Sequence, residues 1–153
     1  MNTAHRHQTF DHGAASGVLV SRPDGVSILS VYGPVTDNVF EWMRAQVKAH
    51  ATHPMLAFCL RMDRAMVAFG KQCMATLAPE SLLTVSAAIV VAPALQAIFQ
   101  DYCWRMAELG YVRVVFTSPS EALLWSVAQA RLAKAQSAWM AQQLVARSLL
   151  KAA

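Results

Sequence analysis

The stretch LRMDRAMVAFG, residues 60–70, sets three charged side chains between two apolar runs. Arg61, Asp63 and Arg64 directly follow MLAFCL, which has the composition of a buried strand. Guanidinium groups beside a carboxylate could bind a small anion or an acidic patch on a partner protein. Solvated Arg–Asp pairs at the end of a strand give the same pattern without any function, because exposed ion pairs contribute little free energy.

Patterns for catalysis and metal binding are weak elsewhere in the chain. The sequence has no P-loop, no GxSxG elbow and no GxGxxG motif. Asp63 has no second carboxylate beside it in the sequence, which acid–base hydrolysis would need. The histidines within residues 5–12 and 50–53 could supply nitrogen ligands, but no cysteine or carboxylate completes a familiar spacing. We therefore predict no catalytic residue, no metal site and no cofactor, and we favour a protein that is not an enzyme.

Composition favours one folded domain in a reducing compartment. The chain has 153 residues, of which 56% are hydrophobic and 14% charged, so a sizeable core is expected and disorder is not. The cysteines, Cys59, Cys73 and Cys103, are odd in number and far apart, which disfavours a disulfide framework or a zinc ribbon. Residues 1–15 are polar, lack the apolar core of a secretory signal and are expected to form a flexible segment. Cytoplasm is the expected location.

The longest apolar stretch, residues 82–99, has the length of a membrane span. It contains Thr84, Ser86 and Gln96, and Pro93 divides it. A strand buried on both faces also reads as a continuous apolar run, and proline is favoured in the first turn of a helix. We therefore expect a strand followed by a helix here, and no membrane span.

Turn and helix signals divide the chain into alternating strands and helices. The turn RPDG predicts a β-hairpin of Gly17–Ser21 and Val26–Gly33, which Pro34 is expected to end. SPSE, Ser118–Glu121, is a capping box with proline in the first turn of a helix. The other predicted elements are a helix from Thr36 and Asp37 to about Ala51, a strand at Met55–Leu60, a helix from about Ala65 to Ala78, a strand at Val85–Val91, a helix from Pro93 to Leu109, a strand at Tyr111–Thr117 and a helix from Pro119 to about Leu150.

This order, β-β-α-β-α-β-α-β-α, predicts an α/β fold with a mixed five-stranded sheet, covering helices and a long C-terminal helix. In such folds ligands favour the crevice beyond the carboxyl ends of the strands, where free N–H groups of helix starts can bind an anion. The residues predicted to bind a ligand or partner there are Thr36, Asp37, Arg61, Asp63, Arg64 and Ser118.

Three segments, VSILSVYGPVT, MLAFCLRMD and VFTSPSEALLW, resemble the STAS fold of anti-sigma-factor antagonists. The resemblance covers about residues 17–128 and implies a STAS-like domain at 16–128 with a regulatory protein partner or a small anionic or lipidic ligand. In signalling members of that family, a serine just after an Asp at the end of the third strand is phosphorylated and regulates binding to a kinase. That Asp position is similar to Asp63, and Arg64 follows it. The resemblance therefore implies that the phosphoryl acceptor is absent here.

The last predicted helix is longer than the sheet needs, so residues 129–153 are expected to form a helical extension. It carries four basic residues and no acidic one, and therefore the whole net charge of +4. Apolar residues follow a 3/4 spacing that Gln142 interrupts, with Trp125, Leu132, Trp139 and Leu149 as the large ones. Packing on its own domain, a dimer helix and a helix lying on a membrane all fit this pattern. We favour self-association, because the stripe is long and rich in alanine.

These features favour a non-enzymatic regulatory or ligand-binding module that acts through protein–protein interaction and self-association. The alternative is a carrier of a small anionic or lipidic ligand, or a small enzyme, with its pocket at the strand ends. Nucleic-acid binding is not expected, since the sequence lacks a basic patch in its core and an aromatic RNA-binding motif.

Overall fold

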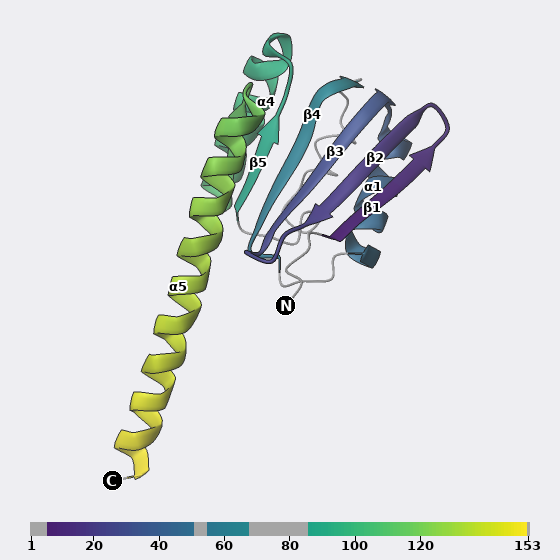
Figure 1. Cartoon of the computed structure of the whole chain (residues 1–153). Coiled ribbons are helices and arrows are strands. Elements are labelled where there is room, and N and C mark those ends of the chain that lie inside the picture. Colours follow the sequence, from purple (N-terminus) through teal and green to yellow (C-terminus); the bar gives the residue numbers. More distant parts are fainter. Residues whose placement is uncertain (1–5, 51–54, 68–85, 153) are drawn as a thin grey trace.

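A mixed β-sheet with helices on both faces forms the body of the protein (Figure 1). The computed structural model describes residues 6–50, 55–67 and 86–152. Within these ranges the strands follow the order β1-β2-β3-β4-β5-β6, antiparallel from β1 to β3 and parallel from β3 to β6. The elements are β1 (Arg6–His12), β2 (Ala15–Ser21), β3 (Val26–Val35), α1 (Asp37–His50), β4 (Ala57–Val67), β5 (Ser86–Val90), η1 (Pro93–Leu95), α4 (Gln96–Glu108), β6 (Val112–Phe116) and α5 (Pro119–Ala152).

The predicted α/β class and mixed sheet are confirmed, but the described sheet has six strands, not five. The additional strand is β1, within the segment expected to be flexible. β1 pairs along its whole length with β2, and Phe10 is buried with its ring in edge contact with Trp42 of α1 at a centroid distance of 5.8 Å. The expectation of flexibility is therefore wrong for residues 6–12.

Strand β3 runs through Pro34 instead of ending before it. Pairing with β2 stops at Tyr32, so the last residues of β3 have a described strand on one side only, where a missing N–H is tolerated. Gly33 has a φ of +82°, a conformation that a side chain would strain. The prediction that Pro34 ends this strand is wrong.

Strand β4 is also longer than predicted and continues from Leu60 to Val67. An irregularity in the β3–β4 register follows the pair Ser30–Arg61, so β4 carries an extra residue there. The helix expected from Ala65 therefore does not begin at that residue, which lies in β4. The remainder of that predicted helix, residues 68–78, lies outside the described residues.

The two faces of the sheet differ in the size of their side chains. Helices α1 and α4 cover one face with large residues, among them Phe40, Phe99 and Tyr102. Helix α5 covers the other face, where it packs Ala122 and Ala130 against β4 and β5. Because these side chains are small, the α5 backbone lies close to the sheet.

Helix α5 begins at the predicted capping box and ends far from the sheet. The Glu121 N–H donates to Ser118 Oγ at 3.4 Å, as an N-cap requires. Ala130 is the last residue of α5 that is buried. Figure 1 shows the helix continuing past the sheet as a single rod, and residues 131–152, called the overhang below, span about 33 Å. No helix within the described ranges is long and apolar enough to cross a membrane.

Candidate functional site

The charged cluster on β4 forms one side-chain pair rather than a converging site. Arg61 donates through Nε and Nη2 to the two carboxylate oxygens of Asp63, at 3.3 and 3.2 Å. This bidentate hydrogen bond raises the pKa of Arg61, and the nearby charge of Asp63 adds to it. Arg64 is exposed and lies opposite Tyr32 in the β3–β4 ladder. Because both partners of the pair are partly solvated, it stabilises the fold by at most about 1 kcal/mol.

The other residues predicted for the strand-end site lie apart from this pair. Arg61 is level with Ser30 in the sheet, whereas Thr36 follows the end of β3, six residues on, or ~20 Å along the strand. Asp37 opens α1, and Thr36 accepts the Phe40 N–H through its carbonyl oxygen. The extra length of β3 and β4 is the reason for this separation.

Ser118 is engaged in capping α5, since its hydroxyl oxygen accepts the Glu121 N–H. Strands β5 and β6 end level with Arg61 through the pairs Arg61–Val90 and Val90–Phe116. Ser118 is thus closer to Arg61 along the strand direction than Thr36 and Asp37 are. The structure separates the six predicted residues into these two groups.

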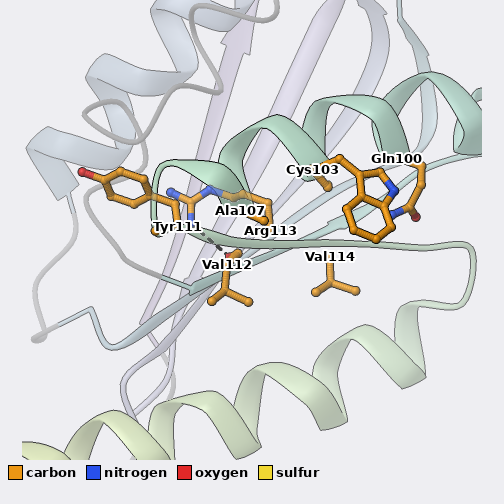
Figure 2. A pocket seen from close by; sticks show the side chains of 9 residues that line it. Gln100, Cys103, Ala107, Tyr111, Val112, Arg113 and Val114 are labelled. Carbon is orange, nitrogen blue, oxygen red and sulfur yellow. Dashed lines mark hydrogen bonds between the residues drawn. The ribbon is translucent and has the colours of Figure 1, made fainter.

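A groove between α4 and the edge strand β6 is a feature that the sequence did not predict. It has a volume of about 390 Å³ and is lined mainly by apolar side chains around Cys103, Trp104 and Val114. Figure 2 shows Arg113 reaching from β6 beneath α4, with its guanidinium beside the Tyr111 ring, 5.7 Å from the ring centroid. Burial lowers the pKa of Arg113. The signal was the arginine at an inward position of the alternating strand YVRVVF.

The described cysteines are buried thiols without a nucleophile's environment. Burial raises the pKa of Cys59, on β4, and of Cys103, on α4, in each case to about 11. A reactive cysteine needs the opposite shift. Both thiols therefore act as packing groups in the core rather than as nucleophiles.

These raised pKa values predict a loss of stability at alkaline pH. In the unfolded chain the thiols ionise near pH 8.5, whereas in the fold they stay protonated to about 11. The stability that the two protonated thiols give to the folded state is therefore complete below their pKa in the unfolded chain. It is lost as the pH rises through their pKa in the fold. Urea unfolding should show a fall on the order of 2 kcal/mol for each thiol, or about 4 kcal/mol in all, between about pH 8 and about pH 10.5. A Cys59→Ala, Cys103→Ala variant with an unchanged pH slope would contradict this assignment.

The histidines do not form a metal site in the described part of the chain. His12 stacks on Trp42 at a centroid distance of 5.1 Å, and His50 lies against Phe10 at 5.4 Å. Residues 6–50, 55–67 and 86–152 contain no group of three or more His, Cys, Asp or Glu side chains that could hold a metal ion. His5 and His53 lie outside the described residues.

The overhang exposes the apolar residues that were predicted to mediate self-association. Its large exposed side chains are Leu132, Trp139, Met140, Leu144, Val145, Leu149 and Leu150. Trp139 and Leu149 are 61% and 67% exposed. Trp125 is different, because it is half-buried and packs on Phe116 of its own sheet, with ring centroids 5.9 Å apart.

A shallow hollow of about 370 Å³ lies on the overhang itself, lined by Ala141, Gln142, Val145, Ala146 and Leu149. Four of these residues are spaced i, i+3, i+4 and i+7, which is the arrangement that receives one side chain of a facing helix in a coiled coil. The hollow shows that this side of the overhang is uncovered by the described residues of its own chain.

Comparison with protein-family models and with curated proteins finds no match for this chain.

Proposed function

We propose that this protein is a non-enzymatic, STAS-like regulatory module that self-associates through the α5 overhang to form a dimer. The observation that carries the proposal is the overhang: seven large apolar side chains are exposed on residues 131–152. These side chains lie on several sides of the helix, and Leu132, Trp139 and Leu149 share one side, which presents exposed apolar surface of the kind that marks an interaction site. The overhang also lacks the packing of an apolar face, from which helices in proteins gain most of their stability.

The regulatory part of the proposal rests on the resemblance of residues 17–128 to STAS domains. The Arg61–Asp63 pair and the exposed Arg64 offer a polar contact surface for a partner protein. The alternative hypothesis, a pocket at the strand ends, is less well supported, because Thr36 and Asp37 lie far from Arg61 along the sheet. A cytoplasmic location is supported by the two buried thiols, which form no disulfide with each other.

Removal of the overhang tests the proposal. A chain that ends after Ala135 keeps Ala130, the last buried residue of α5, and one further turn. Sedimentation velocity should give a dimer for the intact chain and a monomer for the shortened one, with the far-UV circular dichroism of the α/β domain retained. A monomer in both cases, at concentrations up to about 100 μM, where a weak complex of standard size would form, would refute self-association.

A further inference from the structure

We propose that two copies of α5 pair antiparallel, in the register that sets Trp139 of one copy against Ala135 of the other. This inference rests on the self-association proposed above and specifies its geometry. The residues concerned, called the apolar stripe below, are Trp125, Ala128, Leu132, Ala135, Trp139, Gln142, Ala146 and Leu149. They follow the a and d positions of four consecutive heptads, a spacing that keeps them on one side of a helix over its whole length.

Apart from Trp125, whose ring packs on Phe116 of the sheet, the apolar stripe faces away from the sheet that α5 covers. The sheet-facing residues of the first half of α5 are Ala122, Ser126 and Ala130, which are buried. Ala128, at a stripe position, is exposed, and its neighbour Leu124 is 72% exposed. A second helix can therefore contact the stripe along the sheet-bound half of α5 as well as along the overhang.

The basic residues of the overhang lie mostly on the side opposite the apolar stripe, which leaves the stripe free of like charges that would repel in a helix pair. Three of its four basic residues, Lys134, Arg147 and Lys151, occupy b, c and f positions, on the side opposite the stripe. The positions that flank the stripe carry a single charge, Arg131. Two copies can then approach through the stripe without setting like charges face to face, although the overhang contains no acidic residue.

One antiparallel register pairs every residue of the stripe with another member of it. Trp125 then faces Leu149 of the second copy, Ala128 faces Ala146, Leu132 faces Gln142, and Ala135 faces Trp139. Each tryptophan then meets a smaller residue and no layer holds two tryptophans, while Ala128–Ala146 is the one pairing made of two small side chains. The hollow at residues 141–149 lies opposite residues 125–133 of the second copy, with Ala128 level with its centre.

A parallel pair in register fits these side chains less well. It would set Trp139 against Trp139 and Ala135 against Ala135 in adjacent layers, and a single interhelical distance of 8–10 Å, roughly constant along a pair, cannot suit both. In the antiparallel pair the last turn of one helix lies level with the first turn of the second copy. Opposed helix dipoles favour the same orientation.

Spin-label distances distinguish these arrangements. Ser137 and Ser148 are exposed on the basic side of the overhang, so each can be changed to cysteine in a Cys73→Ser background, with Cys59 and Cys103 buried. In the proposed register Ser137 lies at the two-fold axis, whereas the two copies of Ser148 are separated by about 33 Å along it. Electron–electron dipolar measurements on the intact chain should thus give a clearly longer distance for Ser148→Cys than for Ser137→Cys.

Each other outcome overturns the inference in a distinct way. Equal short distances at both positions in a dimer would indicate a parallel pair, which removes the antiparallel geometry but leaves self-association standing. A separation at Ser148 longer or shorter by about 10 Å would indicate pairing shifted by one heptad. A monomer without dipolar coupling would remove both proposals, and co-sedimentation of that monomer with phosphatidylserine vesicles would identify a membrane surface as the occupant instead.

Discussion

A Trp139→Glu substitution should convert the dimer into monomers and leave the α/β domain folded. Trp139 lies at the middle of the apolar stripe, is 61% exposed in the single chain and touches no part of the sheet-covering half of α5. In the proposed pair its indole would be covered, and a carboxylate at this position would lose its hydration. Since the substitution occurs twice in a symmetric dimer, the dissociation constant should rise by about 100-fold or more, which is roughly 3 kcal/mol. Sedimentation equilibrium over a dilution series measures this change.

Leu144→Glu is the matched control. Leu144 is 62% exposed on the same helix, but it lies at an f position, on the side with Lys151. A general hydrophobic attraction between overhangs, or insertion into a lipid surface, would be weakened by both substitutions to a similar degree. The proposed pair predicts instead that Leu144→Glu leaves the dissociation constant within about threefold of the unchanged chain, because an exposed surface substitution has a small effect.

The long C-terminal helix was the part of the structure that the sequence predicted best. Its start is a local signal, since Ser118 and Pro119 act within one turn of the chain. Its stripe is also a local pattern, because residues three and four apart share one side of any helix. The residue at which the helix leaves the sheet was harder to predict. Trp125 belongs to the stripe by spacing, yet its ring also packs on Phe116, because α5 stays on the sheet until about Ala130.

The strand-end site was not predictable for a related reason. Local composition marked Leu60 as the end of a strand, because charged residues follow it. The length of a strand depends on its neighbours, and β3 pairs with β4 as far as Val67. An expected convergence of Thr36 and Asp37 with Arg61 therefore became a separation of about six residues along the sheet.

The first strand and the buried arginine are two further features that could not be predicted from local sequence. RHQTFDH is too polar to suggest a strand, and it becomes one because β2 presents an edge with free backbone groups. Arg113 would be placed at the surface by its type, yet the alternation of β6 turns it toward α4, where burial lowers its pKa. In both cases tertiary contacts overrode the preference of the residue.

Gly33→Ala is expected to be the most damaging single-methyl substitution in the sheet. Gly33 has a φ of +82°, which costs a residue with a side chain about 1–2 kcal/mol. A Cβ at this position would also lie against the carbonyl oxygen of Ala14, in the turn between β1 and β2. That oxygen belongs to the backbone, so relief requires the turn to move away from β3. We expect a total loss of about 3 kcal/mol or more, which corresponds to a fall in Tm of roughly 10 °C.

Gly110→Ala separates the two contributions to this loss. Gly110 has a similar φ, +85°, but no atom lies within 4 Å of the Cβ that alanine would add. It should therefore cost only the conformational part, about 1 kcal/mol. Hydrogen exchange locates the difference: in the Gly33→Ala protein the amides of β1 and of its partner strand β2 should lose protection first, because the displaced turn joins these two strands. Equal losses of Tm in the two variants would show that the contact between Gly33 and Ala14 does not hold β1 in the sheet.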